Sequence, residues 1–339
     1  MNGEDTISFN KQIYYRLITL WVLCEAILGG MMHAVKIPFT GIVVSSGAVI
    51  CISLIAYYVP QKGAILKATI IVAIFKMMLS PHTPPAAYIA VFFQGLMGQI
   101  LFFNRRFFRL SCILLAVLAL VESAIQRIIV LAVLYGNNFW NTVNEFIKKL
   151  TNASKVTDYS LMFATGYIML HAFIGLLVGV FAGSIVWQSK SWSILHEEYL
   201  IQYTNENDII PVKPLQTKRK KKLRYFFVFI WIALIILFVQ SYFHIGPSLL
   251  PPQAALQILL RSILIFLTWY FLISPILSSL IKKWLAHQQI KSKSDINQVV
   301  LMLPSTKYIF LKSWELSSAA KGWKRATAFC KIVLVNILR

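Results

Sequence analysis

Residues 110–135 read LSCILLAVLALVESAIQRIIVLAVLY, an apolar run whose charged residues are Glu122 and Arg127. A helix needs about 20 largely apolar residues to cross the hydrocarbon core of a bilayer, so this run predicts a membrane span. The same criterion, applied outward from it, predicts eight spans, at residues 13–33, 41–59, 63–79, 86–103, 110–135, 159–187, 225–245 and 254–281.

The composition of the whole chain excludes a soluble globular protein. Hydrophobic residues make up 58% of the 339 residues and charged residues only 13%, and the mean hydropathy is +0.68. Soluble domains carry about 25% charged residues. The predicted fold class is therefore an all-α integral membrane protein with about eight transmembrane helices.

The distribution of charge predicts the topology. The chain has 33 Lys and Arg against 12 Asp and Glu, a net charge of +21. If the N-terminus is cytoplasmic, the outside segments hold only Lys36, Lys148, Lys149 and Lys155. The positive-inside rule then predicts both ends inside, in a multi-pass protein of the cell (inner or plasma) membrane. Anionic lipid is the expected partner of the basic segments, and nucleic acid is not, because no aromatic residues interleave with the cations.

A polar, basic stretch divides the chain. Residues 191–224 are predicted to be a cytoplasmic linker between a six-span domain, 1–190, and a two-span module with a tail, 225–339. In the tail, apolar residues recur at steps of three and four, which predicts a cytoplasmic amphipathic helix: Leu316, Ala319, Trp323, Ala326, Cys330, Val333 and Ile337. This helix either lies on the inner leaflet or docks on a partner protein. A similar pattern in 136–158 predicts an amphipathic helix at the outer surface.

Small residues line one face of two predicted spans. They follow a four-residue spacing, which lets helix backbones approach closely. Such faces serve packing within the bundle or the docking of another membrane subunit. The predicted packing residues are Ala26, Gly30 and Ala34 in the first span and Gly175, Gly179 and Gly183 in the sixth.

Ionisable and polar side chains lie within the spans and in the outward loops. Each ionisable group at membrane depth costs at least ~2–3 kcal/mol and usually faces a cavity or a partner. The predicted substrate-binding residues are Lys36, Lys76, His82, Thr83, Gln94, Arg127 and His171. The three cations favour a small guest with an anionic group. The alternative is internal pairing, of Glu25 with Lys76 or Arg127 and of Glu122 with Arg127.

Short catalytic and cofactor motifs are absent from the sequence. There is no GxxxxGK[ST], HExxH or GxSxG pattern. The four cysteines are scattered and the six histidines dispersed. We therefore predict no catalytic residue, no metal site and no cofactor.

The first part of the chain resembles the substrate-binding S components of energy-coupling factor (ECF) transporters. The resemblance covers about residues 10–190 and rests on six spans with both ends inside, the small-residue stripe Ala26-Gly30-Ala34 and the proline-rich outward loop Ser80–Pro85. It implies an outward-facing cavity that captures a vitamin or related micronutrient, and a first span that contacts the coupling subunit.

The second part, residues 225–339, resembles a reduced T component of the same transporters. Leu303-Pro304 is followed by Ala320-Lys321-Gly322, which is similar to the Ala-Arg-Gly motif by which that family docks in a groove of the ATPase. Lys replaces Arg here, and the two spans and one motif are fewer than the family has. The resemblance implies P-loop ATPase subunits as partners and leaves room for a further T component.

The expected function is that of a membrane subunit of an ECF-type importer, and not of an enzyme. It would capture a small anionic or polar micronutrient outside, while separate subunits hydrolyse ATP. The alternatives are an integral membrane enzyme or lipid-handling protein that uses the same buried polar residues, and a scaffold. Copurifying ATPase chains would favour the first, and activity on a lipid substrate the second.

Overall fold

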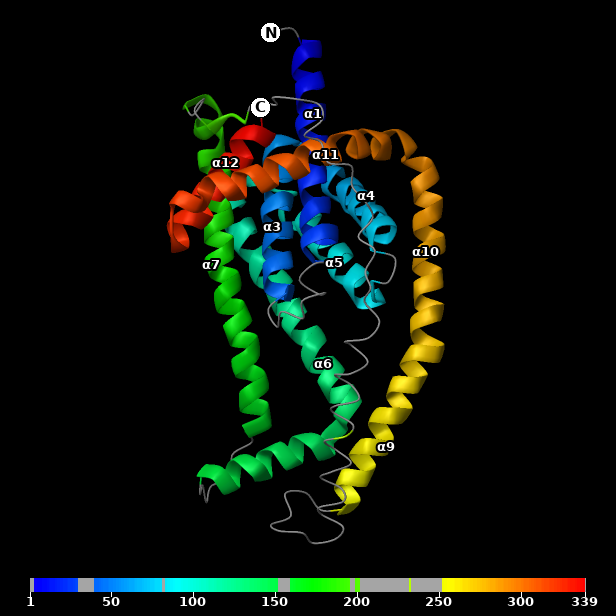
Figure 1. The fold of residues 1–339 in the computed structure, drawn as a ribbon. Coiled ribbons are helices and arrows are strands. Elements are labelled where there is room, and N and C mark those ends of the chain that lie inside the picture. The colour runs from blue at the N-terminus through cyan, green and yellow to red at the C-terminus, as the bar shows by residue number, and fades with distance from the viewer. Residues whose placement is uncertain are drawn as a thin grey trace. The chain divides into compact units, whose positions relative to one another are not determined.

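A computed structural model describes residues 3–29, 40–80, 83–151, 159–195, 199–201, 232 and 252–338 (Figure 1). The regular structure in these ranges is helical throughout, without a strand. The elements are α1 (Gly3–Val22), η1 (Leu23–Leu28), α3 (Thr40–Tyr58), α4 (Ala64–Leu79), α5 (Pro85–Leu101), η2 (Arg105–Phe107), α6 (Phe108–Thr151), α7 (Tyr159–Leu195), α9 (Pro252–Thr268), η5 (Trp269–Ile273), α10 (Ser274–Lys291), α11 (Lys293–Leu316), η6 (Ser317–Ala319) and α12 (Gly322–Ile337).

Four helices of the described part are long and apolar enough to cross a membrane. They are Thr40–Tyr58, Phe108–Val133, Leu161–Trp192 and Leu259–Lys291, and they match the predicted second, fifth, sixth and eighth spans. The other predicted spans within the described ranges are helical too, but α4 and α5 have only 16 and 17 residues. The predicted span 225–245 lies outside the described residues, apart from residue 232.

The long helices carry the exposed apolar surface that lipid contact requires. Leu161 on α7 and Leu264 on α9 expose 63% and 68% of their surface, and Phe163, Phe173 and Phe271 are exposed to a similar extent. Exposed apolar surface this extensive is unusual for a protein in water and typical of one surrounded by lipid or partner subunits. The all-helical, membrane-protein class predicted from composition therefore stands.

The chain forms two compact units. Unit 1 comprises Met1–Leu120, Ala172–Pro214 and Ile281–Arg339, and unit 2 comprises Val121–His171 and Leu215–Leu280. Unit 1 thus joins residues from both sides of the predicted linker. The division of the chain into 1–190, 191–224 and 225–339 stays a prediction.

The core of unit 1 lies among α1, α3 and α4. Trp21 and Ile18 of α1, Ile52 of α3, and Ile71 and Ile74 of α4 are fully buried there. Because these helices are apolar on more than one face, their buried residues come from successive positions rather than from a single narrow stripe. The packed core holds the polar side chains of unit 1 in fixed positions.

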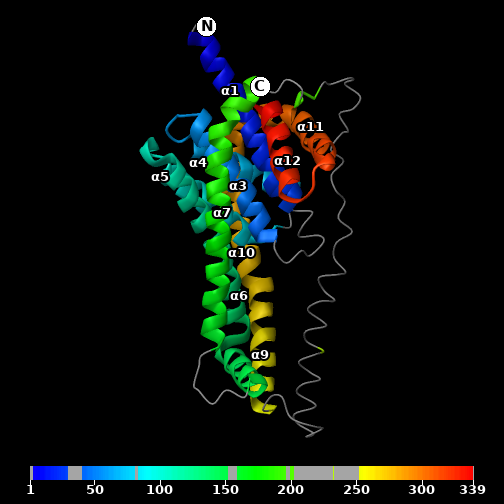
Figure 2. The same ribbon diagram turned by 90° about the vertical axis from the view of Figure 1, so that its left-hand side faces the viewer.

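Two helices from the end of the chain, α11 and α12, pack on α1 and form a hairpin (Figures 1 and 2). The rings of Phe310 and Trp314 on α11 lie 5.0 and 5.5 Å from the ring of Phe329 on α12, in edge-to-face contact. The Arg325 guanidinium lies 4.2 Å from the centre of the Trp314 ring. These contacts fix α12 against α11.

In unit 2, a bend in α6 occurs at Gly136, which has a φ of 66° and a ψ of −171°. This left-handed backbone suits glycine because it has no Cβ. A Cβ at position 136 would lie 2.4 Å from Nη1 of Arg261, so the guanidinium packs directly over the bend. Helix α6 continues beyond the bend to Thr151, over much of the range for which the sequence predicts an amphipathic helix.

Candidate functional site

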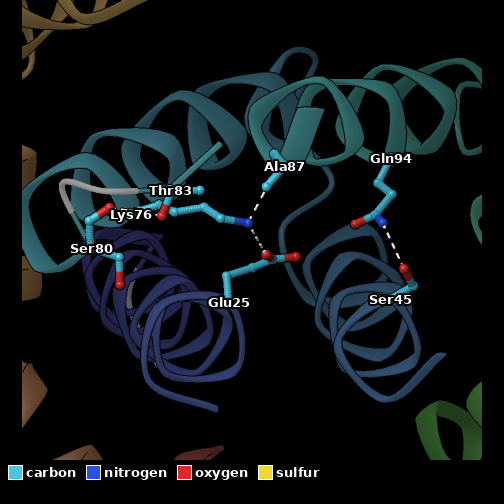
Figure 3. A network of polar contacts seen from close by, with 7 residues as sticks. All are labelled: Glu25, Ser45, Lys76, Ser80, Thr83, Ala87 and Gln94. Carbon is cyan, nitrogen blue, oxygen red and sulfur yellow. Dashed lines mark hydrogen bonds and ion pairs between the residues drawn. The ribbon is translucent and has the colours of Figure 1, made fainter. Parts of the chain in front are cut away.

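A buried ion pair joins the first and third of the predicted spans. Lys76 Nζ on α4 lies 2.7 Å from Glu25 Oε2 in η1, and both side chains are buried (Figure 3). Lys76 also donates to the backbone oxygen of Ala87 in the first turn of α5, at 3.3 Å. An ionised group in an apolar interior needs a partner, and Lys76 has one within the protein. The internal pairing of Glu25 with Lys76, considered from the sequence, is therefore present.

Glu25 lies in a π-helical turn. The segment Leu23–Leu28 continues α1 with wider turns. Such turns are rare, occur mostly as single insertions in α-helices and are frequent at functional sites. The wider turn contains Glu25, whose side chain is buried.

Close contacts of α5 with α3 and α4 position the third side chain of the site, Gln94. A Cβ at Gly95 would lie 2.0 Å from Thr69 Oγ1 of α4, and a Cβ at Gly98 would lie 2.6 Å from Ile52 Cγ2 of α3. Only glycine allows this approach. Gly95 and Gly98 were not among the predicted packing residues, because their spacing of three differs from the four-residue spacing of the GxxxG motif.

Gln94 is buried, and only one of the two polar atoms of its side chain has a hydrogen-bond partner. Its Nε2 donates to Ser45 Oγ on α3 at 3.1 Å, and 1% of the residue is exposed. Its Oε1 is buried and has no hydrogen-bond partner in the described structure. Most buried polar groups in native proteins have a partner, so an orphaned carboxamide oxygen requires an explanation.

Thr83 belongs to the turn that leads into α5. Its backbone N–H and its hydroxyl both donate to the backbone oxygen of Ser80, at 3.0 and 2.7 Å. Pro84 then has the extended conformation of an N-cap, and Pro85 occupies the first helical position, where its missing N–H costs nothing. Thr83 is therefore bonded to Ser80, the C-cap of α4, near Lys76 (Figure 3).

Of the other predicted substrate-binding residues, two lie in unit 2 and two lie outside the described residues. Arg127 and His171 belong to unit 2. Arg127 is exposed, whereas His171 is buried and its Nδ1 lies 3.0 Å from the backbone oxygen of Tyr167. Glu122 accepts a hydrogen bond from Gln126, one turn away, rather than from Arg127. Lys36 and His82 lie outside the described residues.

A second buried polar group lies near the middle of α1. The Tyr15 hydroxyl donates to Asp295 Oδ1 of α11 at 2.5 Å, and Lys67 Nζ of α4 lies 3.0 Å from the same oxygen. Tyr14 donates to the backbone oxygen of Ala64 at 2.8 Å. Because Tyr14 meets Ala64 and Glu25 meets Lys76, α1 and α4 run in the same direction, as the first and third spans should. Nothing in the local sequence marks Asp295.

The predicted coupling motif forms the corner between α11 and α12. Ala320 is half-buried, and Lys321 and Gly322 are exposed. Lys321 is the N-cap of α12, and Gly322 has a φ of 57° with open space around it. The apolar stripe that begins at Leu316 is thus divided, because its first two residues belong to the end of α11 and to η6 rather than to α12. Trp323 has no described side-chain position.

Helix α12 is fixed to the segment that follows α7. Asn336 Nδ2 donates to the backbone oxygen of Tyr199 at 2.9 Å, and its Oδ1 accepts from the Ile201 N–H at 2.9 Å. Lys331 Nζ lies 5.8 and 5.3 Å from the ring centres of Trp192 and Tyr199. This helix therefore packs on protein along its C-terminal half.

The glycines of α7 face α6 within unit 1. A Cβ at Gly175 would lie 2.8 Å from Val117 Cα, and a Cβ at Gly179 would lie 2.4 Å from Ile113 Cα. At Gly183 the nearest atom, Arg109 Cγ, is 3.7 Å away. Gly175 and Gly179 thus pack against α6, so this part of α7 contacts the protein's own helix. Of the first-span set, Gly30 and Ala34 lie outside the described residues, and the side chain of Ala26 is not described.

Comparison of the chain with protein-family models, with curated proteins and with solved structures gave no match.

Proposed function

We propose that this chain is the membrane subunit of an ECF-type importer, which binds a small polar molecule from outside while separate P-loop ATPase subunits supply the energy. The observation that supports this most is the double attachment of α1. Glu25 of the buried polar group lies in η1, which continues α1, and Tyr15, near the middle of α1, binds Asp295 of α11. These two residues are ten positions apart, about 15 Å along a helix.

This arrangement gives a mechanical route between a binding group and a docking element. Arg16 adds a third contact, a donation to the backbone oxygen of Ile337 in α12 at 3.5 Å. A movement of the α11–α12 hairpin would therefore act on α1, and through α1 on the Glu25–Lys76 pair. Interfaces packed in this way transmit a displacement because they are not continuously deformable.

The exposed corner of the hairpin has the chemistry of a docking element. Lys321 and Lys324 are exposed and have no acidic partner in the described structure. Trp314, Leu311 and Leu316 expose about half of their surface nearby. A cation beside apolar surface suits a groove with acidic groups at its rim, as electrostatic complementarity between partners requires.

The test is affinity purification of the full-length chain from its own membrane, with identification of the copurifying proteins by mass spectrometry. We expect P-loop ATPase chains with the wild type and their loss with Lys321→Glu. The folded hairpin should survive, because an acidic residue at a helix N-terminus is favourable. Lys62→Glu, at another exposed lysine, is the charge-matched control and should keep the ATPase.

A second variant tests the shape of the corner. Gly322→Leu introduces bulk but also strains a left-handed backbone. Gly63→Leu is the matched control, since Gly63 has a φ of 81° and likewise has open space around it. ATPase association that is lost in the first variant and kept in the second supports docking. Equal behaviour of the two would overturn the role of this corner.

A further inference from the structure

The carboxyl of Glu122 belongs to an exposed apolar stripe of α6. Glu122 lies near the middle of the membrane-spanning segment Phe108–Val133 and is half-buried. Because about 3.6 residues make a helical turn, Ile125, Ile129 and Val133 share its face of the helix. These three side chains are exposed, by 41%, 55% and 48%. The stripe suits lipid contact, and it places one carboxyl at membrane depth.

One oxygen of this carboxyl has no partner. Glu122 Oε1 accepts a hydrogen bond from Gln126 Nε2, one turn further along α6. Glu122 Oε2 is buried and has no hydrogen-bond partner in the described structure. If the group were ionised, a charge shared by both oxygens would have a single donor. A neutral O–H without a partner costs much less than a charge without one, so this environment favours the protonated form.

No cation among the described residues forms an ion pair with Glu122. On the same helix, Arg127 is exposed and lies about 140° around the axis from Glu122. On α7, the Nδ1 of the buried His171 lies 3.0 Å from a backbone oxygen of its own helix. On α9, the Arg261 guanidinium packs over the bend at Gly136. The carboxyl therefore lacks the counter-ion that an ionised group at this depth requires.

Glu25 provides the opposite case within the same chain. Its carboxyl is also buried, but Lys76 Nζ lies 2.7 Å from its Oε2. We propose that Glu122 is a proton-binding site within the membrane, whose carboxyl is neutral at neutral pH, while Glu25 is ionised. This inference concerns a group that the import proposal does not use, and it holds or fails independently of that proposal.

The test is the labelling of the full-length protein in mild detergent with dicyclohexylcarbodiimide, a hydrophobic reagent for neutral carboxyls. A reagent nitrogen takes the carboxyl proton, the carboxyl oxygen bonds to the central carbon, and the adduct rearranges to a stable N-acylurea. Peptide mapping by mass spectrometry then locates the label. At pH 7 we expect Glu122 to react at least about tenfold faster than Glu25, because a larger fraction of it is protonated. The reaction should slow as the pH rises to 9, because the proton is lost.

Two variants at one position test the role of the missing counter-ion. Gln126→Lys places a cation one turn after Glu122, the favoured spacing for an ion pair on a helix, and should slow the labelling about tenfold. Gln126→Leu is the matched neutral control and should still react. Glu122→Gln should lose the label and keep the unfolding midpoint of the wild type, because a neutral carboxamide replaces a neutral carboxyl.

The pH profile of the wild type decides the question even if a variant fails to fold. Labelling of Glu25 as fast as Glu122, or a rate at Glu122 that is the same at pH 6 and pH 9, would overturn the proposal. Protection of Glu122 by sodium chloride but not by choline chloride would also overturn it, because a metal ion would then occupy the carboxyl. Equal labelling of the Gln126→Lys and Gln126→Leu variants would show that a missing counter-ion does not keep the proton in place.

Discussion

The Tyr15 hydroxyl and the Asp295 carboxylate, 280 positions apart in the chain, lie 2.5 Å from each other in a buried contact. Asp295 is in the first turn of α11, where a carboxylate is also favoured by the helix dipole. Lys67 binds the same oxygen from α4. One carboxylate therefore holds three helices.

The first prediction concerns this contact. Tyr15→Phe keeps the ring and leaves a buried carboxylate oxygen with one donor fewer, so the free energy of unfolding should fall by about 1–3 kcal/mol. Denaturant unfolding of the purified chain in mild detergent measures the change. Tyr270→Phe removes a hydroxyl from an exposed ring and serves as the control. Equal stability of the two variants would show that the contact contributes nothing.

The second prediction concerns the Glu25–Lys76 pair. Lys76→Met leaves a buried carboxylate without its counter-ion and should cost about 3–5 kcal/mol of stability. Adding Glu25→Gln removes the uncompensated charge, so the double variant should recover part of the loss. A double-mutant cycle of unfolding free energies measures the coupling. A double variant as unstable as the sum of the single ones would mean that the two groups do not interact.

The third prediction concerns the glycines of α7. Gly179→Ala places a methyl group 2.4 Å from Ile113 Cα, so α6 and α7 must separate, and stability should fall by about 1–3 kcal/mol. Gly166 lies on the same helix with nothing within 4 Å of a Cβ. Gly166→Ala should therefore be neutral or stabilise by about 0.5–1 kcal/mol through helix propensity. Thermal unfolding of both variants decides, and the reverse order would contradict the described packing.

The fourth prediction concerns Cys330 on α12. Burial raises the pKa of its thiol from 9.0 to about 11, so the reactive thiolate is about 100-fold scarcer at neutral pH than in an unperturbed cysteine. Maleimide labelling of Cys330 should be slow at pH 7.5 and should accelerate until the pH approaches that pKa. Ser318→Cys places a thiol at an exposed position of the same hairpin and should label rapidly at pH 7.5. Rapid labelling of Cys330 at neutral pH would mean that the thiol is not buried.

The fifth prediction concerns topology. If the charge bias sets the orientation, the two ends of α4 lie on opposite sides of the membrane. A cysteine at Lys62, before α4, should react only with reagents applied from inside, and a cysteine at Thr83, after it, with reagents applied from outside. Intact cells and inverted vesicles provide the two sides. Labelling of both positions from the same side would contradict the model of eight alternating spans.

Much of the helical structure could be predicted because it is a local property. The apolar runs 41–59, 110–135, 159–187 and 254–281 are long enough to specify a helix without knowledge of its neighbours, and each corresponds to a described helix of spanning length. A bend is harder to predict. The apolar stripe that begins at Leu316 keeps its spacing across the end of α11, so the periodicity did not reveal the corner between α11 and α12. The glycine at position 322, which has a positive φ in the structure, was the one local signal of that corner.

The polar contacts depend on tertiary packing, which a single sequence specifies poorly. The sequence indicated that Glu25 needs a partner, because an ionised group is costly in an apolar span, but it left that partner open between Lys76 and Arg127. Asp295 lies outside the predicted spans, where a carboxylate needs no partner, so nothing signalled its contact with Tyr15. Lys76 and Gln94 lie in the same region because α5 packs closely on α4 at Gly95. A glycine in a sequence can indicate close packing of a helix, but it does not identify Thr69 as the residue that is contacted.

The composition of unit 1 has a consequence for biosynthesis. Its first segment, Met1–Leu120, is made long before its last, Ile281–Arg339. The Tyr15 side of α1 therefore stays without Asp295 until translation has passed α11. Contacts between residues so far apart form slowly, because loop closure must precede them. During synthesis, the Tyr15 hydroxyl lacks its native partner until all the helices before α11 have been made. The rate of translation, rather than the mature fold, sets the length of that interval.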